Sequence, residues 1–175
     1  VLCRALAPDR GQHDAFEAQL AVLDLGDVLE LGREPADAPQ RSRSELAGDA
    51  AELHSALSNL VTNAVRYTPP GGRITVQWQT LPDGGARFAV QDTGPGIAAE
   101  HLPRLTERFY RIDRSRSRDT GGTGLGLAIV KHVLQRHGAT LQIASVPGQG
   151  SVFSVDFPAS RLRDAALPRP GAASA

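Results

Sequence analysis

Residues 53–67 read LHSALSNLVTNAVRY, and their apolar side chains recur with the spacing of an amphipathic helix. The recurring positions are Leu53, Ala56, Leu57, Leu60, Val61, Ala64 and Val65. Asp49 precedes the pattern as an N-cap residue, and the sequence PPGG at residues 69–72 ends it. The stretch therefore predicts one long helix over residues 49–67 that buries its apolar stripe.

The polar side of this predicted helix carries Asn59 and Asn63, one turn apart, with Arg66 and Tyr67 beside them. An asparagine carbonyl is a hard oxygen ligand of the kind that Mg²⁺ accepts, and an arginine can neutralise phosphate. Tyr67 offers a ring that can lie against a base. The four residues predict a surface for a polyphosphate nucleotide, although two asparagines taken alone fit an ordinary solvated helix face better.

Alternating apolar residues after the helix predict two β-hairpins. Their strands are expected at residues 74–78, 88–90, 141–146 and 152–157. Between the hairpins, residues 98–109 predict a short helical patch, and the apolar run from residue 127 predicts a helix that stops at Gly138. This order predicts an α/β two-layer sandwich, with a mixed, largely antiparallel sheet and helices on one face.

Two glycine-bearing turns are candidates for holding the nucleotide. In DTGPGI, residues 92–97, the Asp92 carboxylate can accept a hydrogen bond from an exocyclic amine such as that of adenine, although a plain tight turn explains the motif equally well. In GTGLG, residues 122–126, glycines expose backbone N–H groups at the start of a helix, where an anion is favoured. The second spacing fits neither the dinucleotide-binding nor the P-loop pattern, and alone it is a weak signal.

A basic stretch lies between the two turns. Its arginines are Arg104, Arg108, Arg111, Arg114, Arg116 and Arg118. Such a segment beside a phosphate site can close over the nucleotide or bind an acidic partner. An ordinary solvated loop is the alternative.

Composition restricts the function classes. The 175 residues suit a single domain, and 19 basic residues balance 19 acidic ones, which disfavours a nucleic-acid binder. A single cysteine excludes an intrachain disulfide framework and a multi-cysteine zinc site, and the five histidines have no metal-ligand company. No apolar stretch reaches the roughly 20 residues that span a bilayer. Because the chain begins with Val1, it is expected to be a piece of a longer protein.

The ends of the chain are harder to interpret. Within residues 1–44, a helix at 14–23 and a short strand at 28–31 are expected, followed by a loop at 34–44. Residues 159–175, rich in Ala, Arg and Pro, predict a disordered tail. The domain is therefore expected to span residues 45–158.

Each of these motifs is weak alone, but their order is specific. NxxxNAxRYTP at residues 59–69, DxGxGI at 92–97, ERFYR at 107–111 and GxGLGL at 122–127 resemble the four ATP-site boxes of sensor histidine kinases. The sequence GxGSxF at residues 148–153 resembles a further glycine turn of that family. Within the family, the sequences of residues 57–65 and 101–111 are similar to those of the phosphate-regulon sensor kinases.

The resemblance implies a Bergerat-type (GHKL) fold with a mobile lid, ATP and Mg²⁺ as ligands, and roles for individual residues. Asn59 and Asn63 would serve Mg²⁺, Arg66 the phosphates and Tyr67 the adenine face. Asp92 would take the adenine amine in a pocket shaped by Gly94, Gly96 and Ile97. The phosphates would be held by Gly122, Thr123, Gly124, Leu125 and Gly126, with Arg111 from the lid. Phe109 and the lid would contact a partner domain.

The resemblance also implies partners that this sequence does not supply. The family's phosphoacceptor histidine lies in a separate dimerising hairpin, and no histidine here has that context; His13-Asp14 lacks the proline that should follow. The expected partners are that domain, a response regulator and a second copy of the whole kinase. The whole kinase is expected to be anchored in the inner membrane, with this domain in the cytoplasm.

The residue at one position distinguishes phosphoryl transfer from ATP hydrolysis. ATP-hydrolysing proteins of similar fold carry a glutamate four residues before the Mg²⁺-binding asparagine, where it activates water. Asn59 occupies that position, and an amide cannot take a proton from water at neutral pH. This favours phosphoryl transfer to a histidine over hydrolysis. The alternative is a non-catalytic nucleotide-binding regulatory module of the same fold.

Overall fold

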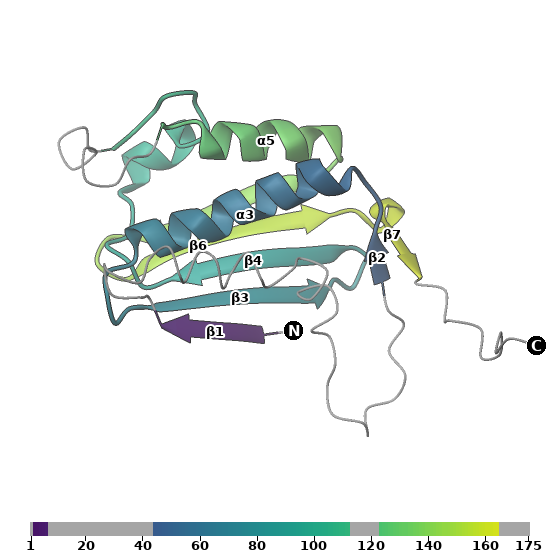
Figure 1. The fold of residues 1–175 in the computed structure, drawn as a ribbon, viewed down its shortest axis with the longest axis horizontal. Coiled ribbons are helices and arrows are strands. Elements are labelled where there is room, and N and C mark those ends of the chain that lie inside the picture. The colour runs from purple at the N-terminus through teal and green to yellow at the C-terminus, as the bar shows by residue number, and fades with distance from the viewer. Residues whose placement is uncertain (1, 7–43, 113–122, 165–175) are drawn as a thin grey trace, which may run out of the picture.

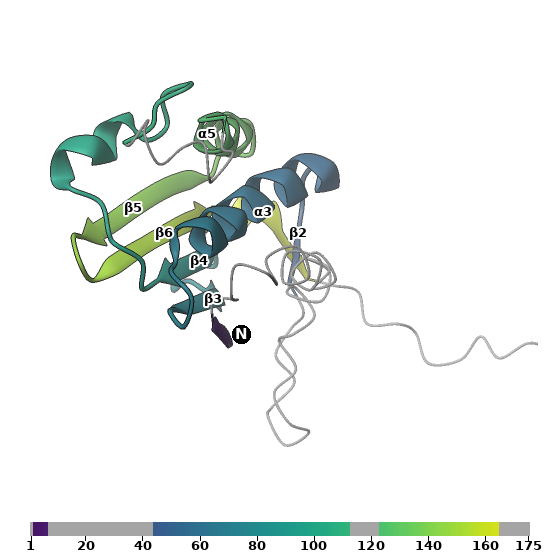
Figure 2. The same cartoon turned by 60° about the vertical axis from the view of Figure 1, so that its left-hand side comes forward.

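The computed structural model describes residues 2–6, 44–112 and 123–164, which form a sheet covered on one face by helices (Figures 1 and 2). The sheet has five strands in the order β1-β3-β4-β6-β5. The strands are β1 (Leu2–Leu6), β3 (Arg73–Thr80), β4 (Ala86–Asp92), β5 (Thr140–Val146) and β6 (Gly150–Phe157). Each neighbouring pair is antiparallel. Both predicted hairpins and the two-layer sandwich are confirmed.

Helix α3 (Ala50–Tyr67) matches the predicted long helix at both ends. The Asp49 side chain caps it by accepting a hydrogen bond from the Glu52 N–H at 3.0 Å. At the other end, the Thr68 hydroxyl donates to the Ala64 carbonyl at 2.6 Å. The predicted stripe is buried at six of its seven positions, Val61 being partly buried.

The core lies between α3, α5 (Gly126–Arg136) and the sheet. Its buried residues from α5 and the strands include Val130, Leu134, Phe88, Val90, Val155 and Phe157. Phe88 faces Trp78 on one side and Val155 on the other in the antiparallel register, so the inward positions of three strands form one apolar layer. Hydrophobic burial of this layer against α3 fixes the helix over the sheet.

His137 joins the two helices at the end of α5. Its side chain is 5% exposed, and Nδ1–H donates to the Val133 carbonyl at 2.8 Å. Nε2 accepts from the backbone N–H of Asp49 at 3.2 Å. Because the carbonyl only accepts and the N–H only donates, these partners assign the neutral tautomer with its proton on Nδ1. The role of His137 is therefore structural.

The ends of the domain differ from expectation. β2 (Ser44–Leu46) pairs with β7 (Leu162–Asp164), and η2 (Ala159–Arg161) leads into β7. The disorder predicted from residue 159 is therefore wrong for residues 159–164, as is the loop assignment of Ser44. Pairing between distant segments orders them, and the Ala47 N–H donates to the Arg161 carbonyl at 2.7 Å. The helix expected at 14–23 and the strand expected at 28–31 lie outside the described residues.

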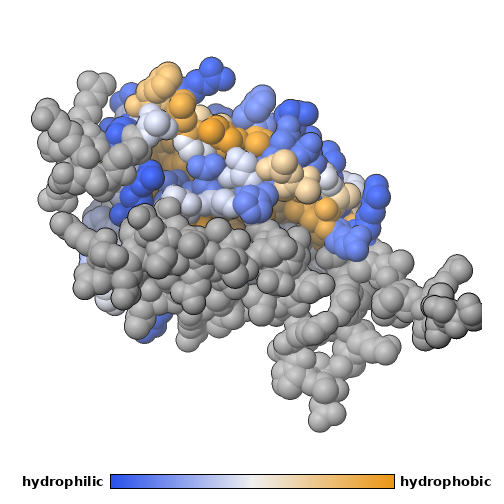
Figure 3. Space-filling view, viewed as in Figure 1, coloured by the Kyte–Doolittle hydropathy of each residue, from blue (hydrophilic) through white to orange (hydrophobic). Residues whose placement is uncertain are grey.

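The short helical patch is smaller than predicted. A 3₁₀ helix, η1, covers Ala99–Arg104, and the chain continues to Phe109 without regular helix. Every helix in the described part of the chain is too short or too polar to cross a bilayer. The surface over the helices is mainly hydrophilic with scattered hydrophobic patches (Figure 3).

Candidate functional site

The middle of α3 meets the start of α5 at Asn59. The Asn59 Nδ2 donates to the Ser55 carbonyl at 2.8 Å, and because that carbonyl only accepts, the side-chain oxygen points the other way. A Cβ added to Gly126 would lie 2.8 Å from this Oδ1. Only glycine lets the first residue of α5 approach the amide so closely.

The end of α3 meets the turn after β4. Asp92 is 6% exposed, and its Oδ1 accepts from the Gly94 N–H at 2.8 Å. A Cβ on Gly94 would lie 2.8 Å from that oxygen and 2.9 Å from the Tyr67 carbonyl. The turn therefore packs against the last residue of α3. The Gly94 N–H of the same turn holds the Asp92 carboxylate in place.

Burial shifts the pKa of the Asp92 carboxyl group. Removal from water raises the pKa of its carboxyl group above the ordinary 3.8, and backbone hydrogen bonds from Gly94 and Ser151 counteract part of that rise. A buried carboxylate with a fixed orientation is a specific acceptor for a ligand's N–H group.

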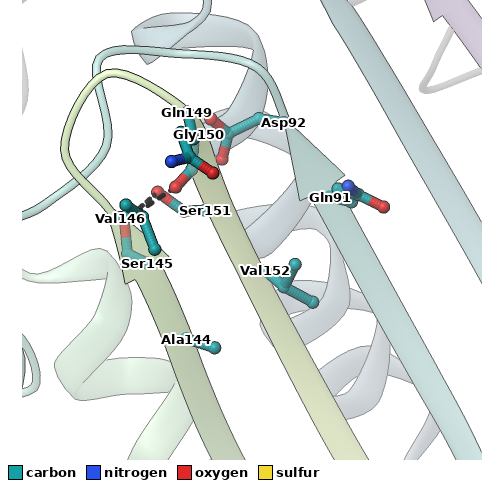
Figure 4. A pocket seen from close by; sticks show the side chains of 9 residues that line it. All are labelled: Gln91, Asp92, Ala144, Ser145, Val146, Gln149, Gly150, Ser151 and Val152. Carbon is teal, nitrogen blue, oxygen red and sulfur yellow. Dashed lines mark hydrogen bonds between the residues drawn. The ribbon is translucent and has the colours of Figure 1, made fainter.

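The β5–β6 hairpin supports this turn from the far side. Gly96 has φ +68°, and a Cβ there would collide with the Val146 carbonyl. The Ile97 N–H donates to Ser145 Oγ at 2.8 Å, and the Gly148 N–H donates to the Pro95 carbonyl at 2.8 Å. Sequence reasoning missed Ser145 and Ser151, whose hydroxyls lie 3.0 Å apart (Figure 4). Their only signal was the alternation of the two strands, which places both on the side of the core.

Asp92 also borders a hollow that Figure 4 shows from close by. Its lining residues are Gln91, Asp92, Ala144, Ser145, Val146, Gln149, Gly150, Ser151 and Val152. The lining combines both faces of the sheet: Gln91 and Val152 alternate with the core residues Val90 and Phe153, whereas Asp92 and the two serines share the core side.

The glycine turn before α5 contacts the segment that leads into residues 113–122. The Phe109 N–H donates to the Gly124 carbonyl at 2.9 Å. A Cβ on Gly124, which has φ +72°, would lie 2.9 Å from the Phe109 Cα. The third and fourth motifs are thus in direct backbone contact.

The predicted site residues gather along one side of α3. Asn59, Asn63 and Arg66 are half-buried, and the Tyr67 side chain is 51% exposed. Asn59 and Tyr67 are eight residues apart, which is ~12 Å along a helix. Gly126 lies beside Asn59 and is preceded in the chain by Leu125, Gly124 and the exposed Thr123. Gly94 lies beside Tyr67, in the turn that also contains Asp92, Gly96 and Ile97. Arg111 is half-buried, and Gly122 lies outside the described residues.

Comparison with known proteins decides the family. The profile of the histidine kinase-, DNA gyrase B- and HSP90-like ATPases matches residues 48–161. The chain belongs to this ATPase family. The resemblance in the four motifs is thereby confirmed, and the match to this histidine kinase-like ATPase domain includes η2 beyond the predicted boundary at residue 158.

Curated relatives of this ATPase domain are sensor kinases. The phosphate regulon sensor protein PhoR of Pseudomonas aeruginosa is 59% identical over 121 residues, 69% of this chain and 27% of the relative. The sensor-like histidine kinase SenX3 of Mycobacterium tuberculosis is 46% identical over 123 residues, 70% of this chain and 29% of the relative. The chain thus spans less than a third of the length of these relatives.

Solved structures show the same fold. The mycobacterial sensor histidine kinase MprB aligns with a TM-score of 0.57 at 33% identity, covering 67% of this chain and 75% of that one. Full-length ShkA, determined in complex with AMPPNP, aligns with a TM-score of 0.61 at 31% identity, covering 94% of this chain and 32% of that one.

Proposed function

We propose that this ATPase domain binds Mg-ATP and passes the γ-phosphoryl group to a histidine on a dimerisation domain outside this chain. The observation that carries the proposal is the double contact of α3, with Gly126 at Asn59 and with the Gly94 turn at Tyr67. One helix thus joins a candidate anion site to a candidate base site, ~12 Å apart. The relationship to PhoR at 59% identity supports a role in phosphate-regulon signalling.

At the base end, the buried Asp92 carboxylate would accept a hydrogen bond from the adenine amine. Gly94 and Gly96 would shape the pocket for the ring, with Ile97 in the same pocket and the exposed Tyr67 side chain against the adenine face. The support is that the carboxylate is already oriented by the Gly94 N–H, so binding requires little reorganisation.

At the phosphate end, the backbone N–H groups of residues 122–126 would face the phosphates at the start of α5. Arg66 and Arg111 would add positive charge there. The donor set suits Mg²⁺, because Asn59 uses its Nδ2 on Ser55 and keeps its oxygen for a ligand, with Asn63 one turn further on. When bound, Mg²⁺ would neutralise charge on the phosphate oxygens.

Transfer is favoured over hydrolysis by the chemistry of Asn59. Its amide cannot remove a proton from water at neutral pH. Positioning and charge neutralisation supply most of the catalysis in phosphoryl transfer, so a nucleophile from another domain suffices. The phosphorylated kinase would then pass the phosphoryl group to a response regulator. The whole protein is proposed to be a homodimer anchored in the inner membrane, with this domain in the cytoplasm.

Two measurements test the proposal. Calorimetry of the 175-residue chain should show binding of ADP or ATP that depends on Mg²⁺, and γ-labelled ATP should not label the chain itself. Addition of the dimerisation domain of the same kinase should then yield phosphohistidine on that domain. Self-labelling would contradict the missing acceptor. Binding without any transfer would favour the alternative, a nucleotide-binding regulatory module that is not catalytic.

A further inference from the structure

Phe109 has a strained backbone that its own side chain does not explain. Its φ is +63°, and among the described residues it is the one non-glycine residue with positive φ. Phe109 is 69% exposed, so burial of apolar surface does not offset the strain. Such a conformation persists only where the neighbouring structure holds it.

The backbone of Gly124 supplies one part of that support. The Phe109 N–H donates to the Gly124 carbonyl at 2.9 Å, and Gly124 itself has φ +72°. Two residues with left-handed backbone conformations, Phe109 in the basic stretch and Gly124 in the glycine turn, are therefore joined by this hydrogen bond. Movement of either backbone would break the same hydrogen bond.

The following residue, Tyr110, supplies the other part. Its hydroxyl lies 2.8 Å from His101 Nδ1. His101 Nε2 faces Glu100 Oε1 at 3.6 Å. In the tautomer with its proton on Nε2, Nδ1 is the acceptor for the Tyr110 hydroxyl. The half-buried ring is thereby tied to η1.

A cation fixes the ring plane. The guanidinium carbon of Arg104 lies 4.3 Å from the centre of the Tyr110 ring, and Glu107 holds that guanidinium through hydrogen bonds of 3.3 Å. The Tyr110 N–H also donates to the Glu107 carbonyl at 3.3 Å. Tyr110 is thus held at its hydroxyl, its ring face and its backbone.

We propose that His101 is a positioning residue for the nucleotide site. Acting through Tyr110, it keeps the Phe109 backbone against Gly124 and so shapes the turn that opens α5. His101 touches no proposed ligand site itself, and the hydrogen bond to Tyr110, which we name the His101–Tyr110 clamp, is its route of action. The role in nucleotide binding rests on the proposed function; the effect on Phe109 does not.

The clamp lies outside the hydrophobic core. Neither His101 nor Tyr110 belongs to the buried cluster that joins α3, α5 and the sheet. Loss of the hydrogen bond should therefore leave global unfolding nearly unchanged while loosening Phe109 locally. This separation makes the inference testable against a merely structural role.

The test compares His101→Leu and Tyr110→Phe with His101→Asn, whose amide can occupy the place of Nδ1. Exposed His132→Leu is the matched control. Hydrogen exchange in the 175-residue chain is followed at the Phe109 amide, with the buried Leu60 amide as reference, and Mg-ADP affinity is measured alongside. His101→Leu and Tyr110→Phe should each speed Phe109 exchange about tenfold or more and weaken Mg-ADP several-fold, leaving Leu60 unchanged.

The double variant should be no worse than the more severe single variant, because both remove one hydrogen bond, and His101→Asn should restore most of the loss. Unchanged Phe109 exchange in Tyr110→Phe, which keeps the ring, would overturn the inference even if His101→Leu failed to fold. Faster exchange with unchanged Mg-ADP affinity would overturn the link to the nucleotide site. If the unmodified chain bound no Mg-ADP, the proposed function would fail, while Phe109 exchange would still report on the clamp.

Discussion

The side-chain oxygen of Asn59 lies 2.8 Å from the place where a Cβ on residue 126 would stand. This relationship joins the first and last of the four motifs, although 67 residues separate them in the chain. It makes residue 126 a sensitive probe of the site, because a single methyl group there meets the proposed metal ligand directly.

Gly126→Ala should weaken nucleotide binding without unfolding the domain. Alanine is a better helix former, and the Asn59 side chain can rotate away, so the free energy of unfolding should change by less than about 1 kcal/mol. The rotation displaces Oδ1, and Mg-ADP affinity should fall about tenfold or more by calorimetry. The Asn59→Ala/Gly126→Ala pair should bind no worse than Asn59→Ala alone; a further additive loss would show that the two residues act independently.

Asn63→Ala should remove the dependence of ATP affinity on Mg²⁺, because it deletes the second proposed oxygen ligand. The measurement is a titration with ATP in Mg²⁺ and in excess EDTA, expected to give equal affinities for the variant only. Thr62→Ala, on the neighbouring half-buried position, is the control and should retain the difference. Retained Mg²⁺ dependence in Asn63→Ala would place the metal elsewhere.

Asp92→Asn should bind nucleotide less tightly and yet be as stable as the unmodified chain, or more so. Since burial raises the pKa of this carboxyl group, the folded state holds its proton more tightly than the unfolded state, and the charged form destabilises the fold above the raised pKa. Asparagine removes that cost at neutral pH and can still accept from the Gly94 N–H. Loss of a hydrogen bond to a charged group is worth about 1.5–3 kcal/mol, or roughly ten- to hundredfold in affinity.

The pH dependence provides the check for Asp92. Urea unfolding should show that the stability difference between the variant and the unmodified chain shrinks as pH falls through the raised pKa toward 3.8 and below, where both side chains are neutral. A variant that is clearly less stable at pH 7 would contradict the role of desolvation.

Arg87 and Asp156 should form a pH-dependent stabilising pair that has no part in nucleotide binding. They face each other on β4 and β6, with Nη2 donating to Oδ2 at 2.6 Å, and Arg87 lowers the pKa of the Asp156 carboxyl. Their stabilisation is present above pH 3.8 and is lost as pH falls below it through the lowered pKa. A double-mutant cycle in urea should give a coupling at pH 7 that disappears at low pH, with Mg-ADP affinity unchanged throughout.

His137→Leu should destabilise the domain by about 1–3 kcal/mol, because the part-buried Asp49 N–H would lose its acceptor. Thermal or urea unfolding measures the loss. His132→Leu, an exposed change on the same helix, should stay within about 0.5 kcal/mol. Equal effects of the two substitutions would show that the link between α3 and α5 contributes nothing at His137.

Local patterns predicted the elements whose stability is local. α3 carries its own cap, periodicity and breaker, and both main hairpins alternate with clear turns. β2 and β7 could not be predicted, because each has three residues and depends on pairing with a segment more than 100 residues away. η1 ends earlier than expected, and Phe109 then takes a backbone conformation that its residue type disfavours.

The sequence suffices to propose residues for the candidate site, but not to predict how they contact one another. Spacing on one helix places Asn59 and Asn63 together, whereas the approach of Gly126 to Asn59 depends on how α3 and α5 pack. The backbone contact between Phe109 and Gly124, and the His101–Tyr110 clamp, likewise join residues that no periodic pattern relates. Both contacts arise only from the tertiary packing of the chain.

The pairing of Ser44 with Asp164 gives α3 a lever arm. This pairing lies next to the first turn of the helix, and Tyr67 lies 17 residues beyond Ala50, or ~26 Å along the helix axis. A rotation of about 10° around this pairing would swing the far end through ~4–5 Å at that radius. A small change of angle at the Ser44–Asp164 pairing would thereby displace Tyr67 by more than the thickness of a base.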